Sequence, residues 1–124
     1  MKLNISVKIL DAANLGISID SVLDYIRKDL PAYVGITATT TMISFAAQLA
    51  DEIKKHFPHI ITIIGGPHIS ALPEETIERF PSFDLGIYGE GEITLFEIIN
   101  KGKIDNTIQG IVFKENGIIT KTAP

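Results

Sequence analysis

Three short segments of the sequence combine small residues with residues that can form hydrogen bonds. They are Thr37 to Thr40, Gly65 to His68 and Gly89 to Glu92. Glycine lets a ligand approach the backbone closely, and threonine hydroxyls supply neutral hydrogen bonds. A helix is expected to start after each segment, so that backbone N–H donors would face the same space. We therefore expect the three segments to form one ligand-binding site.

Patterns of apolar residues predict the elements that must position these segments: alternation at 5–10, continuous apolar runs at 33–36 and 60–64, and helical spacing in the helices. Strands are expected at 5–10, 33–36, 60–64 and 84–88, and helices at about 18–30, 42–57, 73–80 and 92–102. Strands alternating with helices predict an α/β domain of the Rossmann-like (flavodoxin-like) class, with a parallel sheet and helices on both faces. The carboxyl ends of parallel strands share one edge of the sheet, where ligands bind. The three segments should therefore converge there.

Local signals predict where several elements begin and end. Ser18 or Asp20 is expected to cap the first helix, whose inner face should include Leu30. Pro73 fits the first position of a later helix. Asn116-Gly117 lies between two apolar runs, which predicts a hairpin with a type I′ turn.

Each site residue also has an ordinary structural explanation. The threonines at 39–41 could cap the long helix, and Gly65-Gly66 could be a plain strand-to-helix turn. A single histidine such as His68 is more often structural than a metal ligand, and carboxylates at a helix start are stabilised by the helix dipole. Only the combination at successive strand ends favours a site.

Composition excludes several classes of protein. The 124 residues suit one domain, and the chain has no cysteine, which excludes a disulfide, a thiol nucleophile and an iron–sulfur cluster on this chain. The net charge of −4 is spread out with no basic stripe, so nucleic acid is not an expected partner. No apolar run reaches membrane-spanning length and no secretion signal is visible, so we expect no membrane and a cytoplasmic location.

Familiar catalytic patterns are missing from the sequence. The stretch from Gly89 to Thr94 lacks the third glycine of the dinucleotide fingerprint, and there is no GxxxxGK[ST] loop, no HExxH and no Ser-His-Asp order. We therefore assign no catalytic residue and no metal ligand.

The loop sequences resemble those of a known family. Val34-Gly-Ile-Thr-Ala-Thr-Thr40, Ile64-Gly-Gly-Pro-His68 and Tyr88-Gly-Glu-Gly-Glu92 look like the cobalamin-binding domain of radical S-adenosylmethionine (SAM) enzymes. The likeness covers nearly the whole chain and is greatest to the anaerobic magnesium-protoporphyrin IX monomethyl ester oxidative cyclase family. The resemblance implies that this chain is the cofactor-binding part of an oxidoreductase that acts in tetrapyrrole biosynthesis.

The resemblance implies a set of cobalamin-binding residues. Thr37 and Thr39 would line the pocket for the nucleotide tail of the cofactor, and the glycines would let that tail pass close to the backbone. The stretch Asp11 to Gly16 lacks the cobalt-binding histidine of a DxHxxG motif, so no protein ligand to cobalt is expected. The full set of expected cofactor-binding residues is Thr37, Thr39, Thr40, Gly65, Gly66, Pro67, His68, Gly89, Glu90 and Gly91.

The resemblance also implies a missing partner. The family's radical SAM catalytic domain carries a CxxxCxxC motif that binds a [4Fe-4S] cluster and S-adenosylmethionine. This chain has no cysteine and therefore lacks that motif. Residues 1–124 are therefore expected to be one cobalamin-binding domain that is not catalytic alone, with a hairpin at 108–122 leading toward the catalytic domain. The family's first βα unit is also expected to be missing, so this chain alone should bind cobalamin weakly or not at all.

Two other functions stay open, and one structural consequence follows. The domain could be a regulatory or interaction module that binds no corrinoid, or an enzyme using His68, Glu90 and Glu92 as acid–base groups. Visible absorption by a bound corrinoid would distinguish a cobalamin-binding domain from both.

Without the family's first βα unit, the strand at 5–10 should pair directly with the strand at 33–36. This arrangement should leave an exposed edge of the sheet, which favours a homo-oligomer.

Overall fold

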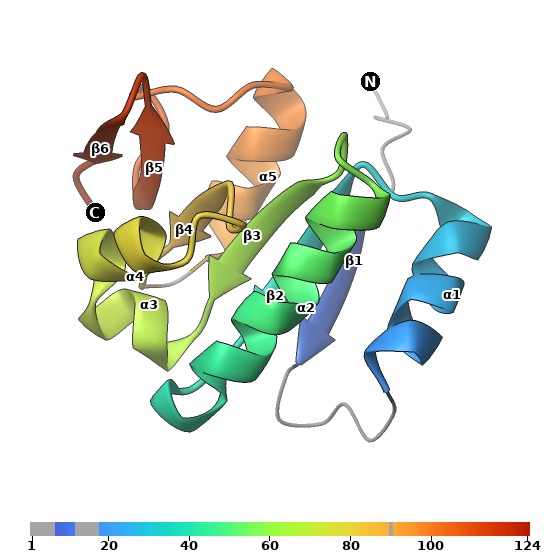
Figure 1. Ribbon diagram of the computed structural model, residues 1–124. Helices are drawn as coiled ribbons and strands as arrows, with labels where there is room; N and C mark the ends of the chain where they lie inside the picture. Colours follow the sequence, from blue (N-terminus) through green and yellow to red (C-terminus); the bar gives the residue numbers. More distant parts are fainter. Residues whose placement is uncertain (1–6, 12–17, 90) are drawn as a thin grey trace.

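The computed structural model describes residues 7–11, 18–89 and 91–124, and these form one sheet flanked by helices (Figure 1). The six strands are β1 (Val7–Asp11), β2 (Tyr33–Thr37), β3 (Ile61–Gly65), β4 (Leu85–Ile87), β5 (Ile111–Glu115) and β6 (Ile118–Lys121). The helices are α1 (Ile19–Asp29), α2 (Ile43–His56), α3 (Pro67–Ala71), α4 (Pro73–Arg79) and α5 (Glu92–Lys101), with a short 3₁₀ turn, η2 (Thr40–Met42), before α2. No described helix is both long and apolar enough to span a bilayer.

The strands lie in the sheet in the order of the sequence, from β1 to β6. β1 to β4 are parallel, and β5 and β6 run antiparallel as a hairpin added to β4. β1 pairs directly with β2, from Val7 opposite Tyr33 to Asp11 opposite Thr37. The expected direct pairing is thus confirmed for residues 7–10, while residues 5 and 6 lie outside the described part of the chain.

The sequential strand order decides which face each helix covers. Right-handed crossovers that all move in one direction across a sheet leave their helices on the same face. Accordingly α1, α2, α3 and α4 contribute to one apolar cluster, which includes Ile26, Leu49 and Ile77. Figure 1 shows α1 and α2 side by side over this face. α5 packs on the opposite face, so helices cover both faces of the sheet and the predicted fold class is confirmed.

The opposite face has a smaller cluster, built by α5 and the hairpin. Ile98 of α5 packs there with Leu85, Ile111 and Phe113, all of them buried. Side chains alternate along a strand, so Val7 and Ile9 of β1 also face this side. Ile9 nevertheless remains 63% exposed. The described part of the chain therefore covers this face completely near β4 and incompletely near β1.

Some predicted element ends are confirmed and one is wrong. The Ser18 side chain caps α1 by accepting a 3.3 Å hydrogen bond from the backbone N–H of Ser21. Leu30, expected on the inner face, is instead the left-handed residue that ends α1 (φ 44°) and is 56% exposed. It leaves the helical path just before Pro31, because a proline disfavours helical backbone at the preceding residue.

The hairpin turn is confirmed by its backbone angles. Asn116 and Gly117 have φ values of 52° and 80°, the two positive values that a type I′ turn requires. The turn places the end of β6 beside the start of β5, at the same edge of the sheet where β4 ends. The hairpin therefore brings residues 121–124 close to the carboxyl ends of the parallel strands.

Candidate ligand-binding groove

The first two loops after the parallel strands meet, as the sequence predicts. Thr37 lies opposite Gly65 in the β2–β3 register. Beyond the strands, the N–H of Ala38 donates to the carbonyl of Gly65 at 3.1 Å, and the N–H of His68 donates to the carbonyl of Ala38 at 3.4 Å. Segments 37–40 and 65–68 are thus joined by backbone hydrogen bonds.

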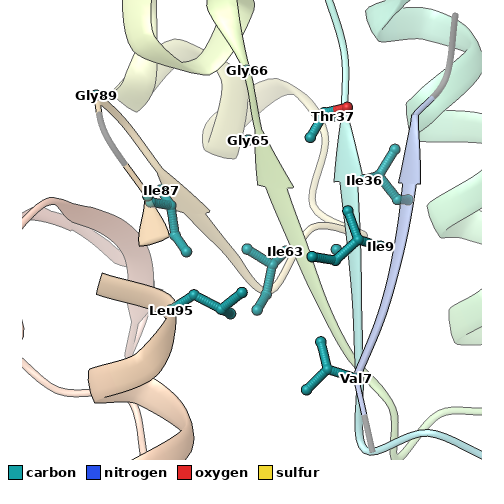
Figure 2. A pocket seen from close by; sticks show the side chains of 12 residues that line it. Val7, Ile9, Ile36, Thr37, Ile63, Gly65, Gly66, Ile87, Gly89 and Leu95 are labelled. Carbon is teal, nitrogen blue, oxygen red and sulfur yellow. The ribbon is translucent and has the colours of Figure 1, made fainter. Parts of the chain in front are cut away.

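The third segment joins them around a groove of about 250 Å³. Gly89 and Gly91 both line the groove. Figure 2 shows Gly89 on the side of the groove formed by the end of β4, with Thr37, Gly65 and Gly66 at the upper end. The predicted convergence on one edge of the sheet is therefore confirmed for every described residue of this lining. Glu90 lies outside the described residues.

The groove runs down the less covered face of the sheet. Figure 2 shows Ile9 of β1 and Leu95 of α5 on either side of Ile63, which stands on β3 between them. Val7 and Ile87 complete the apolar walls. No described lining residue carries a charged side chain, and only the hydroxyl of Thr37 is polar. Such a groove suits a flat or aromatic group that enters from the edge of the sheet.

Glycine at the floor keeps the groove open. A Cβ added to Gly35 would stand 3.8 Å from Ile9 Cγ1, and one added to Gly65 would stand 3.9 Å from Thr37 Cγ2. Both are ordinary contact distances, so the backbone does not require glycine at either position. A side chain there would instead occupy the groove.

Gly66 has a different role, because the backbone itself requires it. Its φ is 101°, a conformation that other residues rarely adopt. A Cβ there would also lie 2.9 Å from the carbonyl oxygen of Ala38 and 3.0 Å from its nitrogen. Gly66 therefore permits the close approach of the two loops that closes the upper end of the groove.

Two predicted residues belong to a separate hollow of about 200 Å³. The Nδ1 atom of His68 lies 3.2 Å from the hydroxyl of Thr40, and both residues line this hollow together with Ser44 and Arg79. It lies between the start of α2 and helices α3 and α4. His68 is only 8% exposed and has a hydrogen-bonded partner, as the structural explanation for a lone histidine predicts.

The remaining predicted residues line neither hollow. Thr39 is exposed, and its hydroxyl lies 3.0 Å from that of Thr41. The suggestion that these threonines cap the long helix is wrong: neither η2 nor α2 has a side-chain cap. Pro67 occupies the first position of α3, a helix that was not expected from the sequence. In retrospect, Pro67 gives the same helix-start signal as Pro73.

Most of the apolar lining was not predicted from the sequence. The loop residues were predicted, but the residues that form the floor and walls were not: Val7, Ile9, Gly35, Ile63, Ile87 and Leu95. The available signal was strand periodicity, since residues two apart on β1 share one face. Choosing which face bears a ligand required knowing that α1 to α4 all cover the other one. No group of three or more His, Cys, Asp or Glu side chains within the described ranges could hold a metal.

The geometry defines a class of protein: an open α/β sheet with a ligand groove at the carboxyl ends of its parallel strands. The chain belongs to the B12 binding domain family, which it matches over residues 2–99. This confirms the resemblance inferred from the loop sequences and the prediction of a cobalamin-binding type of domain.

Individual relatives agree with the family. The chain is 34% identical over 121 residues to an uncharacterized methyltransferase of Pyrococcus horikoshii, covering 95% of this chain and 26% of that protein. It is 25% identical over 120 residues to the anaerobic magnesium-protoporphyrin IX monomethyl ester cyclase of Cereibacter sphaeroides, covering 92% and 20%. The chain thus spans about a quarter or less of the length of these relatives.

A solved structure shares the fold. It is the cobalamin-dependent S-adenosylmethionine radical enzyme OxsB with aqua-cobalamin bound, which matches 98% of this chain and 23% of that enzyme with a TM-score of 0.78 and 19% identity. The arrangement of strands and helices in this chain therefore occurs in an enzyme that also contains much more polypeptide.

Proposed function

We propose that this chain holds cobalamin, with the nucleotide tail of the cofactor inserted in the groove between α5 and the face formed by β1 to β3. The observation that carries the proposal is the groove itself: an apolar slot floored by Gly35 and Gly65, open at the carboxyl edge of the sheet. Its dimensions and lining fit an aromatic base, and the hydroxyl of Thr37 at its mouth can bond to a polar part of the tail.

The lining of the groove indicates which role belongs to the cofactor and which to the protein. Cofactors such as cobalamin carry the difficult chemistry, and the protein supplies binding and orientation. The groove offers apolar contact and no charged group among its described residues, which suits holding a cofactor rather than transferring protons. We therefore assign this domain the role of a cofactor-binding module that is not catalytic alone.

We further infer that the parent enzyme is a cytoplasmic radical SAM oxidoreductase of the oxidative cyclase type, acting in tetrapyrrole biosynthesis. The support is the similarity to the cyclases of Cereibacter sphaeroides and of Rubrivivax gelatinosus, the latter 29% identical over 109 residues. The partner of this module would then be a radical SAM catalytic domain with its S-adenosylmethionine and [4Fe-4S] cluster. In that assembly the cofactor held by the groove would face the catalytic domain.

The test is titration of the purified chain with hydroxocobalamin, followed by visible absorption and calorimetry. We expect binding in the high micromolar range, because the groove is incompletely covered at Ile9 and contacts its ligand mainly from one side. Gly65→Leu should abolish this binding, since its side chain fits the backbone but fills the groove. Ala32→Leu is the matched control, because Ala32 is exposed at the opposite end of β2.

The outcomes separate the alternatives clearly. Binding by the wild type and by Ala32→Leu, but not by Gly65→Leu, supports the proposal. No binding at millimolar protein would overturn it and favour a regulatory or interaction module. Equal binding by Gly65→Leu would place the cofactor somewhere else. Binding in the low micromolar range or tighter would contradict the expectation that incomplete cover of the groove makes binding weak.

A further inference from the structure

Tyr88 lies in the wall of the groove but points away from it. Its neighbours Ile87 and Gly89 both line the groove, whereas the Tyr88 hydroxyl donates a hydrogen bond to the carbonyl of Thr122. Lys121 places its ammonium 5.1 Å from the centroid of the Tyr88 ring. Tyr88, which lies between two residues that line the groove, is thus attached to the segment that follows β6.

That segment is itself fixed to the start of β5. The N–H of Thr122 donates to the carbonyl of Ile111 at 2.9 Å, and the hydroxyl of Thr122 accepts from the N–H of Ile111 at 3.0 Å. The N–H of Gly110 donates to the carbonyl of Ala123 at 2.8 Å. Because these bonds hold residues 122 and 123 against the start of β5, the Thr122 carbonyl is a fixed acceptor for the Tyr88 hydroxyl.

The same region holds the other parts of this wall. The N–H of Tyr88 donates to the carbonyl of Gly110 at 3.1 Å, and the hydroxyl of Thr94 on α5 donates to the carbonyl of Gln109 at 3.2 Å. A Cβ on Gly110 would lie 3.2 Å from the Thr94 hydroxyl oxygen, so the two segments pack without space for a side chain. The end of β4 and the first turn of α5 therefore share one support.

We propose that Tyr88 is a positioning residue, whose hydroxyl holds the groove wall at Ile87 and Gly89 against the hairpin and thereby sets the width of the groove. This inference rests on the proposed function for the identity of the ligand, but its structural part does not. When the bond to Thr122 is lost, the wall keeps the backbone bond from Tyr88 to Gly110 and the 3.0 Å bond from the N–H of Gly89 to the hydroxyl of Ser70, but it loses its side-chain attachment to the segment after β6. The hairpin is then a support of the binding site as well as a connection along the chain.

The first experiment compares Tyr88→Phe with the wild type in the full chain. We expect about fivefold weaker cobalamin binding, the effect of losing roughly 1 kcal/mol of hydrogen bonding. We also expect faster hydrogen exchange at the amides of Gly89 and Leu95, with the exchange of β2 and β3 amides unchanged. Tyr25→Phe is the matched control, because it too loses a hydroxyl contact, with Lys8 on the other face of the sheet.

A double-mutant cycle tests the route to the hairpin. Thr122→Val removes the hydroxyl that fixes Thr122 to Ile111 and should also accelerate exchange at Gly89. Because both substitutions act through one contact, their combined effect should be smaller than the sum of the two. Additive effects would show that Tyr88 and Thr122 act separately and would overturn the proposal.

The readouts distinguish this inference from the proposed function. If the wild type binds cobalamin and Tyr88→Phe changes neither affinity nor local exchange, the positioning role is wrong. If the wild type binds no cobalamin, the proposed function fails, and the exchange measurements still decide the role of Tyr88. Uniformly faster exchange throughout Tyr88→Phe would indicate a general loss of stability and would also contradict the inference.

Discussion

The carbonyl oxygen of Ala38 lies 2.9 Å from the position that a Cβ of Gly66 would occupy. This contact joins the loops after β2 and β3, and it coincides with a backbone conformation that favours glycine, with φ at 101°. Two independent constraints therefore act on one residue, one from the local backbone and one from a neighbouring loop.

We expect Gly66→Ala to destabilise the domain by more than about 2 kcal/mol, because it combines backbone strain of about 1–3 kcal/mol with displacement of the Ala38 loop. Gly102→Ala is the control: its φ is 68°, but nothing lies within 4 Å of the added Cβ. Gly102→Ala should lower the free energy of unfolding only by the cost of a non-glycine residue in left-handed backbone, about 1–2 kcal/mol. Urea unfolding measures both, and equal losses would show that the Ala38 contact is unimportant.

The helix-capping predictions can be tested with two alanine substitutions. Ser18→Ala removes the acceptor for the Ser21 amide and should cost about 1 kcal/mol in the free energy of unfolding. Thr39→Ala removes only an exposed hydroxyl contact with Thr41 and should change stability by less than about 0.5 kcal/mol. Chemical denaturation compares the two. A larger loss in Thr39→Ala would restore the capping role that the structure denies.

Tyr88 should make stability depend on pH in the alkaline range. Burial raises the pKa of Tyr88 above the usual value of about 10, so the folded state favours the protonated phenol. The corresponding stabilisation is fully present below pH ~10 and is lost as the pH rises through the higher pKa of the folded state. The free energy of unfolding should therefore fall more steeply above pH ~10 in the wild type than in Tyr88→Phe. Parallel slopes would contradict this prediction.

The edge of the sheet at β1 should favour self-association. Ile9 is 63% exposed on this strand, and an apolar edge strand is a ready site for pairing with another chain. Light scattering should show a mass that increases with protein concentration. Ile9→Lys should reduce the increase, because a charge on the edge opposes pairing. A strictly monomeric mass at high concentration would refute the prediction.

The sequence predicts most of the fold because its signals are local. Continuous apolar runs predict β2 and β3, helical periodicity predicts α2, and Asn116-Gly117 predicts the hairpin turn. Leu30 is where such reasoning fails, since periodicity cannot indicate that a residue leaves the helix just before Pro31. The helix at Pro67–Ala71 is missed for a related reason: its five residues are too few for a periodic pattern.

The site is only partly predictable for a different reason. Glycines and threonines at strand ends mark the upper end of the groove, because those residue types are unusual at such positions. Its walls, such as Ile63 and Leu95, look like ordinary core residues in the sequence. They line a groove only because α1 to α4 all cover the other face, and that depends on the order of the strands. His68 shows the converse, since it belongs to the predicted loop but faces a second hollow.

The order of the strands also has a consequence for how the domain folds. Every strand of the described sheet pairs with its neighbour in the sequence, and paired residues of the parallel strands and of β4 and β5 lie within about 30 positions of each other. Closing a short loop costs less chain entropy than closing a long one, so no pairing has to wait for a distant segment. Each βα unit can therefore dock on the one before it, and the sheet can grow from β1 toward β6 during synthesis. A strand inserted centrally from elsewhere in the chain would remove this simple order.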